Sequence, residues 1–354
     1  MGILLIDYTQ ANQKSQYKNF KLYQLQNGGN KMCTAVSFRT KDHYFGRNLD
    51  FEHGFGEKVV ITPRNYPFTF RKVPTINSHF AIIGVAVTDN GYPLYFDGTN
   101  EKGLSMAGLY FPGNAVYLPE KPGMDNITPF EFIPWILSTC ENIVQAQEKL
   151  SNLNLVDIPY SENYPLSPLH WLIADPKQSI VIESTENGIK IFENPVGVLT
   201  NNPPFDFHMH NLTGYLNLTR EEPESRFSQN LQLTPYSRGM GAIGLPGDLS
   251  SPSRFVRAAF VKLNSVCKDT ESASVSQFFH ILRSVAQQEG CARVGDAFEK
   301  TIYTSCCNTD KGIYYYTTYE NAQITAIAMH NADLNGSEVT AFQLITEQQI
   351  RREN

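Results

Sequence analysis

Cys33, Arg47 and Asp50 are the residues whose types and spacing suggest chemistry. Cys33 lies in residues 32–35 (MCTA), and the other two lie in residues 45–50 (FGRNLD). If these two segments pair as a hairpin, Arg47 and Asp50 return toward Cys33. A thiol beside a cation has a lowered pKa and a larger thiolate fraction. The pattern therefore predicts a cysteine nucleophile, although a buried core thiol with a surface ion pair or turn cap is the alternative.

A cysteine nucleophile needs a base, and Cys33 could supply its own if it were the first residue. An α-amine with a pKa near ~8 can take the thiol proton and later return it to a leaving amine. Met32 directly precedes Cys33, and an initiator Met before a small residue is expected to be removed. As numbered, however, the chain leaves Cys33 without a free amine.

Residues 1–32 are predicted to be a leader that is not part of the mature enzyme. The apolar run at residues 3–6 lacks the basic region and cleavage site of a signal peptide. The following residues are rich in Gln, Asn, Lys and Tyr and show no clear period. The codons for Gly28 and Gly29 can also spell a ribosome-binding sequence shortly before the Met32 codon. We expect the chain to start at Met32 or to be cut there, with residues 33–354 forming a single domain.

The elements that must position these residues alternate between strands and helices. Strands are predicted at 34–38, 43–46, 58–62, 80–88 and 94–98, at 170–174, 179–184 and 188–192, and at 301–305, 313–318 and 323–328. Helices are predicted at 130–140, 143–150, 253–266 and 274–288, the first of them with an N-cap at Thr128 and Pro129 in its first turn. This order predicts an α+β fold with antiparallel hairpins.

Composition excludes several classes of function. The net charge of −6 is scattered without a basic stripe, which argues against nucleic acid. The longest apolar stretch, residues 80–87, is far shorter than the ~20 residues that span a membrane. Six cysteines without a C-x-x-C pair indicate reduced thiols in a cytoplasmic protein. His208 and His210 lack a third ligand, so neither a metal nor another cofactor is predicted.

Several motifs in register resemble the choloylglycine hydrolase family, which includes bile salt hydrolases and penicillin V acylases. They are residues 32–35 and 45–50, residues 100–104 (NEKGL), 199–203 (LTNNP) and 245–248 (LPGD), residues 253–255 (SRF), and residues 303–316. The resemblance runs from Met32 almost to the C-terminus. It implies a four-layer αββα N-terminal-nucleophile hydrolase sandwich with two stacked antiparallel sheets, in a homotetramer.

The resemblance also assigns roles that spacing alone does not. Without it, Asn201 lies in a simple turn and Arg254 in the first turn of a helix. By matching motif, the site would comprise Cys33 as nucleophile and base, Arg47 and Asp50 to orient and polarise it, Asn201 and the backbone N–H of Tyr110 as oxyanion donors, Asn202 on the substrate and oxyanion side, and Arg254 to complete the charged network.

The predicted reaction is hydrolysis of the amide bond of glycine- or taurine-conjugated bile salts. Tyr110 stands where many bile salt hydrolases carry Asn and penicillin V acylases commonly carry Tyr, whereas the flanking residues 105–108 and 111–115 are more similar to the bile salt enzymes. Penicillin V acylase activity is therefore an alternative. A catalytically silent binding protein is another, if the leader is retained.

A steroid acid needs a roomy apolar pocket with a polar mouth. Candidate lining residues are Phe51, Met106, Ile158 and Tyr160, each of which would serve equally well in the core. The loop 234–241 could present Arg238 to the carboxylate or sulfonate of the leaving group, although a solvated surface Arg is equally consistent with the sequence.

Overall fold

The computed structural model describes residues 31–354. Most of the predicted leader, residues 1–30, therefore lies outside the described residues. The strands are β1 (Cys33–Arg39), β2 (His43–Phe51), β3 (Lys58–Thr62), β4 (Ile82–Asp89), β5 (Tyr92–Tyr95), β6 (Asp97–Asn100), β7 (Ser105–Tyr110), β8 (Asp125–Ile127), β9 (Leu153–Leu155), β10 (Leu169–Ala174), β11 (Ser179–Thr185), β12 (Gly188–Glu193), β13 (Val198–Leu199), β14 (Arg293–Val294), β15 (Ala297–Phe298), β16 (Lys300–Asn308), β17 (Ile313–Thr318), β18 (Thr325–Ala328) and β19 (Thr340–Gln343). The helices are α2 (Phe132–Leu137), α3 (Ile143–Leu150), α4 (Phe205–Asn211), α5 (Ser251–Leu263) and α6 (Glu271–Arg283), with 3-10 turns at Leu212–Tyr215, Met240–Ala242 and Met329–Asn331.

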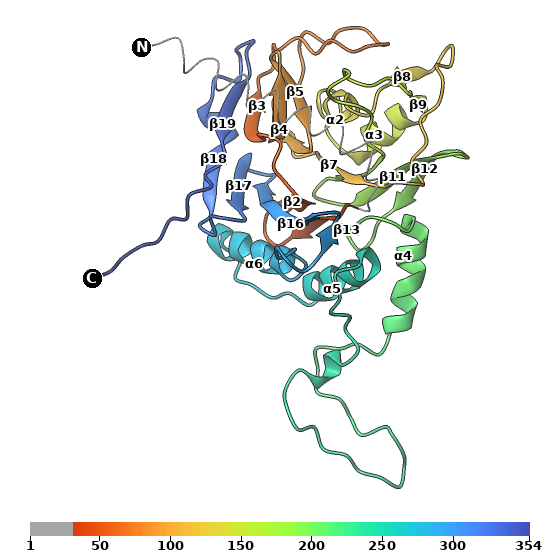
Figure 1. Cartoon of the computed structure of the whole chain (residues 1–354), viewed down its shortest axis with the longest axis vertical. Coiled ribbons are helices and arrows are strands. Elements are labelled where there is room, and N and C mark those ends of the chain that lie inside the picture. The colour runs from red at the N-terminus through yellow and green to blue at the C-terminus, as the bar shows by residue number, and fades with distance from the viewer. Residues whose placement is uncertain (1–30) are drawn as a thin grey trace.

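Two antiparallel sheets form the centre of the molecule. One has the strand order β13-β1-β2-β16-β17-β18, and the other has the order β12-β11-β10-β7-β6-β4-β3-β19, with β5 paired to β4. Helices α5 and α6 pack on the first sheet, and α2 packs on β6 and β7 of the second. Figure 1 shows these helices on opposite sides of the stacked sheets. The predicted α+β four-layer αββα sandwich is confirmed.

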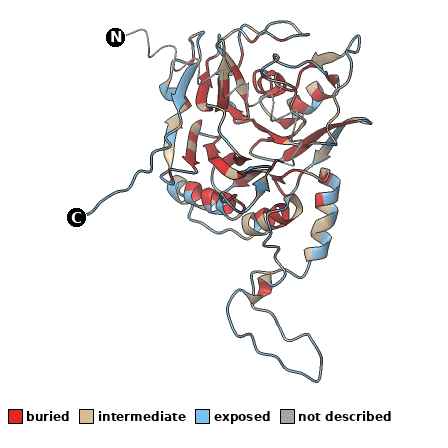
Figure 2. Cartoon of the chain, in the orientation of Figure 1, coloured by how far each residue is buried: buried red, intermediate tan, exposed pale blue. Residues whose placement is uncertain are grey.

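Buried apolar residues form the core between the layers. Figure 2 shows that most of the strands of the two sheets are buried. One core cluster joins the two sheets to α5 and α6, and includes Val36, Leu172 and Phe278. A second lies between the larger sheet and helices α2 and α3, and includes Trp171 and Ile136. Among the helices of residues 31–354, none is long and apolar enough to cross a bilayer.

Gly46 allows β2 to lie tightly against β16. A Cβ atom built on Gly46 would lie 2.0 Å from the carbonyl oxygen of Ser305, which is backbone and has little freedom to move. Any side chain at this position would therefore push β16 away from the strand that carries Arg47.

Several predicted boundaries were wrong for local reasons. The helix predicted from residue 130 begins at Phe132 with Glu131 as N-cap, because the Thr128 N–H instead donates to the Glu131 carboxylate at 3.1 Å. Helix α5 begins before Ser253, whose hydroxyl donates to Asp248. Helix α6 begins at Glu271 with Thr270 as N-cap, before the predicted start at residue 274. The strand predicted at 94–98 is divided between β5 and β6, and β7 was not predicted.

Candidate active site

Cys33 begins β1, where the predicted hairpin with β2 is confirmed. In the antiparallel register Cys33 pairs with Leu49 and Ala35 pairs with Arg47. The Arg47 Nη2 donates to the Cys33 Sγ at 2.7 Å, and both side chains are buried. The surface ion pair considered for Arg47 and Asp50 is wrong, since both are almost fully excluded from solvent.

The pKa of the Cys33 thiol is raised, whereas a cation beside the thiol predicted a lowered pKa. Burial raises its pKa, and this outweighs the opposing effects of the Arg47 charge and the Asp50 backbone N–H. Arg47 therefore limits the cost of forming a thiolate without making it the resting form. A thiol in this state needs a base beside it to act as a nucleophile at neutral pH.

Arg47 also ties the two sheets together. Its Nη1 donates to the carbonyl oxygens of Phe96 and Gly108 in the facing sheet, at 3.1 Å and 2.5 Å. Behind it lies buried Asp97, whose carboxylate accepts hydrogen bonds from Tyr303 at 2.7 Å and Tyr314 at 2.5 Å. The guanidinium is thus held in one position by two carbonyl oxygens and the Cys33 sulfur.

Asn201 and Arg254 hold the backbone of Cys33. The Cys33 N–H donates to Asn201 Oδ1 at 2.7 Å, and Arg254 Nη2 donates to the same oxygen at 2.8 Å. Arg254 Nη1 donates to the Cys33 carbonyl at 2.5 Å and to the Thr34 hydroxyl at 2.7 Å. The structure therefore brings Asn201 and Arg254, far away in sequence, onto the nitrogen and carbonyl of the predicted nucleophile.

Tyr110 contacts the nitrogen of the Asn201 side-chain amide, whose oxygen faces Cys33 and Arg254. The Asn201 Nδ2 donates to the Tyr110 carbonyl at 2.8 Å. Since Phe111 N–H donates toward β10, to the Pro168 carbonyl, the preceding Tyr110 N–H and carbonyl point to the opposite edge of β7. That edge is the one facing Asn201. Tyr110 N–H and the Asn201 amide can therefore approach a common point.

The Asn202 side chain bonds to the loop that follows β7. Its Nδ2 donates to the Pro112 carbonyl at 2.7 Å, and its Oδ1 accepts from Asn114 at 3.0 Å. It joins two loops beside the site and is not among the residues that line the cavity described below. A direct role for Asn202 on the substrate or the oxyanion stays a prediction.

Two buried carboxyl groups lie near Cys33, Asp50 and Glu299, and only Asp50 was predicted from the sequence. Burial raises the pKa of Asp50 to about 6, opposed by Arg254, by a hydrogen bond from Thr301 and by Arg47. Burial, followed by repulsion from Asp50, raises the pKa of Glu299 to about 8. Glu299 accepts a hydrogen bond from Met32 N at 2.5 Å. No local motif marks Glu299, because only the pairing of distant strands brings it to the site.

A cavity of about 460 Å³ opens at the Cys33 sulfur. Its walls are mostly apolar or aromatic, including Phe51, Tyr110, Phe130, Ile133, Tyr160, Tyr164, Leu169 and Trp171. Its volume falls within the range typical of small-molecule pockets. Phe51 and Tyr160 were predicted as lining and are found there.

Other lining predictions were wrong. Met106 is fully buried in the core cluster beneath α2, deeper along β7 than Gly108 and Tyr110. Ile158 does not line the cavity. Arg238 is exposed on a loop and absent from the cavity wall, which agrees with the alternative of a solvated surface Arg. Lys31, one of the two leader residues that the structure describes, does line the cavity. Its ammonium lies 3.9 Å from the Phe51 ring centroid.

Within residues 31–354 no three His, Cys, Asp or Glu side chains gather as a metal site would require. The features that do converge are a buried thiol, a guanidinium on it, amide donors beside it and an apolar cavity in front of it. A site of this kind in a four-layer sandwich is typical of an amide hydrolase with a cysteine nucleophile.

Comparison with known proteins agrees with this class. The pattern of the linear amide C–N hydrolases, choloylglycine hydrolase family, matches residues 33–342. The chain therefore belongs to the choloylglycine hydrolase family, and it is a linear amide C–N hydrolase.

Individual relatives cover nearly the whole chain. A bile salt hydrolase/transferase from Lactiplantibacillus plantarum is 53% identical over 90% of this chain and 98% of the relative. A bile salt hydrolase/transferase from Clostridium perfringens is 41% identical over 88% of this chain and 96% of the relative.

Solved structures show the same fold. The crystal structure of a mutant conjugated bile acid hydrolase from Clostridium perfringens superposes with a TM-score of 0.85 and 38% identity, and covers 91% of this chain and 100% of that one. A penicillin V acylase from Agrobacterium tumefaciens gives a TM-score of 0.68 at 16% identity, covering 90% and 94% of the two chains, and this likeness concerns the fold alone.

Proposed function

We propose that this protein hydrolyses the amide bond of glycine- or taurine-conjugated bile salts, with Cys33 as an N-terminal nucleophile. The observation that carries the proposal is the Cys33 thiol, held by Arg47 at 2.7 Å at the end of a largely apolar cavity of about 460 Å³. The names of the relatives, which share up to 53% of their residues with this chain, supply the substrate class.

In the proposed acylation the sulfur attacks the amide carbonyl carbon, and the thiol proton passes to the α-amine of Cys33. The Asn201 amide and the Tyr110 N–H stabilise the negative oxygen that forms. Losing one such donor typically costs about 10²–10³ in rate. When the C–N bond breaks, the proton passes from the α-ammonium to the departing amine of glycine or taurine. A thioester of the bile acid remains on Cys33.

In the proposed deacylation, water attacks the thioester carbonyl while the α-amine takes its proton. The same oxyanion donors act again, and collapse releases the free bile acid and the thiol. An amine that attacks in place of water would form a new amide. The relatives named hydrolase/transferase make this transfer a second candidate activity for the same thioester.

The proposed mechanism requires a free amine at Cys33, so we propose that residues 1–32 are absent from the active form. Two contacts support a blocking effect of the leader when it is present. The Met32 N–H is bound to Glu299, and the Lys31 side chain lies in the cavity that the acyl group would enter. A chain that keeps its leader would be the silent binding protein considered above.

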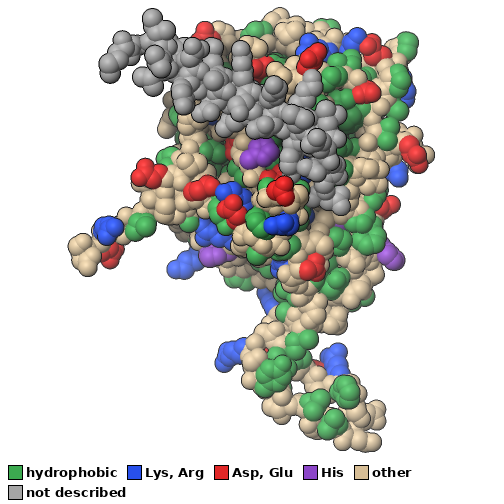
Figure 3. Space-filling view, viewed as in Figure 1, with side chains coloured by type: hydrophobic (Ala, Val, Ile, Leu, Met, Phe, Trp, Pro, Cys, Tyr) green, Lys and Arg blue, Asp and Glu red, His purple; other side chains and the backbone are tan. Residues whose placement is uncertain are grey.

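We also propose a homotetramer in the reducing cytoplasm. All six cysteines are free thiols. A long loop projects from the body of the molecule, and Figure 3 shows hydrophobic side chains gathered on it. Phe227, Leu233 and Tyr236 are exposed there, and exposed apolar groups of this kind mark interaction surfaces. Light scattering coupled to gel filtration measures the assembly size, and a monomer contradicts this part of the proposal.

Turnover of glycocholate, taurocholate and penicillin V by one purified protein that starts at Met32 tests the function. We expect bile salts to be hydrolysed, with little release from penicillin V. No turnover of either bile salt refutes the proposal, and turnover of penicillin V alone supports the acylase. Cys33→Ser should abolish turnover in a folded protein, whereas a rate within a few-fold of the parent shows that the nucleophile is misassigned.

A further inference from the structure

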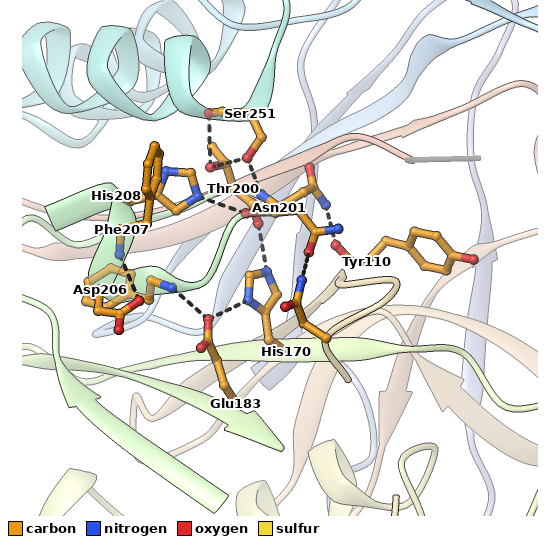
Figure 4. A network of polar contacts seen from close by, with 12 residues as sticks. Tyr110, His170, Glu183, Thr200, Asn201, Asp206, Phe207, His208 and Ser251 are labelled. Carbon is orange, nitrogen blue, oxygen red and sulfur yellow. Dashed lines mark hydrogen bonds and ion pairs between the residues drawn. The ribbon is translucent and has the colours of Figure 1, made fainter. Parts of the chain in front are cut away.

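The backbone that carries Asn201 is held by two buried histidines (Figure 4). His170 Nε2 lies 2.9 Å from the Thr200 carbonyl oxygen, and His208 Nε2 lies 2.8 Å from the Asn201 carbonyl oxygen. The Asn201 N–H donates to the Ser251 hydroxyl at 2.9 Å. Both rings are fully buried. The two peptide groups that flank Asn201 are thus held by three side-chain contacts.

The carbonyl partners determine where the protons lie. A carbonyl oxygen only accepts, so Nε2 of each ring must carry a hydrogen. Burial lowers the pKa of His208 to about 4, which leaves a neutral ring with its single proton on Nε2. Each histidine therefore acts toward Asn201 as a donor in a fixed orientation.

Glu183 contacts the His170 ring. Its Oε1 lies 3.2 Å from His170 Nδ1, and the same oxygen accepts from the Phe205 N–H at 2.9 Å. The Phe111 ring stacks on His170 with centroids 4.3 Å apart and an interplanar angle of 6°. Glu183 is itself fully buried, so the pair is held away from water.

Stability alone is a weak reason for this arrangement, because a buried ionisable pair carries a desolvation cost that well-packed apolar side chains avoid. The position of the pair is more informative. Asn201 is the second residue after the short strand β13, and its side chain binds Cys33 N through Oδ1 and the Tyr110 carbonyl through Nδ2. A rotation of its peptide would displace both ends together.

We propose that His170, Glu183 and His208 are positioning residues that hold the Asn201 amide where the oxyanion forms. This inference rests on the proposed function. Because the amide would be needed most in the transition state, its misplacement lowers kcat and leaves KM almost unchanged.

His170→Leu tests the role of the donor, and His170→Gln tests its rescue, since a glutamine amide can still donate to the Thr200 carbonyl. We expect His170→Leu to lower kcat for glycocholate by about 10–100-fold with KM within about twofold, which is part of the loss expected for a complete oxyanion donor. We expect His170→Gln to recover most of this loss.

A second readout separates positioning from general weakening of the fold. An aldehyde analogue of the bile acid forms a tetrahedral adduct with Cys33, whereas the free bile acid does not. His170→Leu should weaken aldehyde binding by about the same factor as kcat and leave free bile acid binding unchanged. The matched control is His43→Leu, another buried histidine, whose ring bonds to the Ser37 and Thr309 hydroxyls. It should lower the melting temperature without changing kcat.

The inference is overturned if folded His170→Leu keeps the parental kcat and aldehyde affinity while only its melting temperature falls. If that variant does not fold, Glu183→Gln decides, because it keeps the volume and removes the charge. A fall in kcat of about 3–10-fold at constant KM is then expected, and an unchanged kcat overturns the inference. A wild-type protein that turns over no bile salt refutes the proposed function itself.

Discussion

Replacing Arg47 with Gln removes the cation from the buried Cys33 sulfur. The Arg47 Nη2 lies 2.7 Å from Sγ, and burial already raises the thiol pKa. A hydrogen bond to a charged group contributes roughly 1.5–3 kcal/mol, which corresponds to about one to two pKa units. We therefore expect the thiol pKa to rise by that amount, and kcat/KM for glycocholate to fall about 10–100-fold.

The assay is the rate of alkylation of Cys33 by iodoacetamide as a function of pH, read by mass spectrometry of the peptide that contains Cys33. This readout separates Cys33 from the exposed Cys291. The midpoint of the rate profile should move to higher pH in Arg47→Gln, and Arg47→Lys should move it less. Arg257→Gln is the matched control, since this half-buried arginine binds the Ser284 and Pro246 carbonyls and not the thiol. A folded Arg47→Gln with an unshifted midpoint refutes the reasoning.

Two further predictions concern stability. Gly46→Ala should lower the free energy of unfolding in urea by about 1–3 kcal/mol or more, because its Cβ would meet the Ser305 backbone. Gly214→Ala, whose Cβ meets nothing within 4 Å, should change it by less than about 0.5 kcal/mol, and equal effects would contradict the packing argument. The pKa of Glu299 is raised to about 8 from 4.5, so its folded state favours the neutral acid, and stability is lost as the pH rises from about 4.5 through 8. In a chain that keeps Met32, Glu299→Gln should therefore gain melting temperature over the parent at pH 9 and not at pH 5, and a constant difference would show that Glu299 titrates normally.

The sequence predicted the parts of the site that depend on neighbours along the chain. The β1–β2 hairpin places Arg47 opposite Ala35, and alternation along the strands sends both Cys33 and Arg47 into the protein. Asn201 and Arg254 came only from resemblance to a family, because their approach to Cys33 depends on contacts across more than 150 residues.

Other residues were missed because their signal lies in packing. Glu183 lies within β11 and Glu299 lies between β15 and β16, and neither belongs to a local motif; only their burial distinguishes them. Met106 was a candidate for the pocket wall or for the core, and it lies in the core because α2 covers that part of β7. Periodicity gives the face of a strand and does not give the point along it where a helix stops covering it.

If Cys33 acts with its own α-amine as base, the catalytically active protein must begin at Cys33, and its N-terminus can be measured during turnover. Active protein is mixed with glycocholate, quenched with acid during turnover, and analysed by mass spectrometry of its N-terminal peptide. We expect a peptide that begins at Cys33, and we expect a fraction of it to carry the mass of a bile acid thioester. Full activity in a protein whose first residue is Met1 or Met32 contradicts this expectation, because Cys33 would then have no free amine.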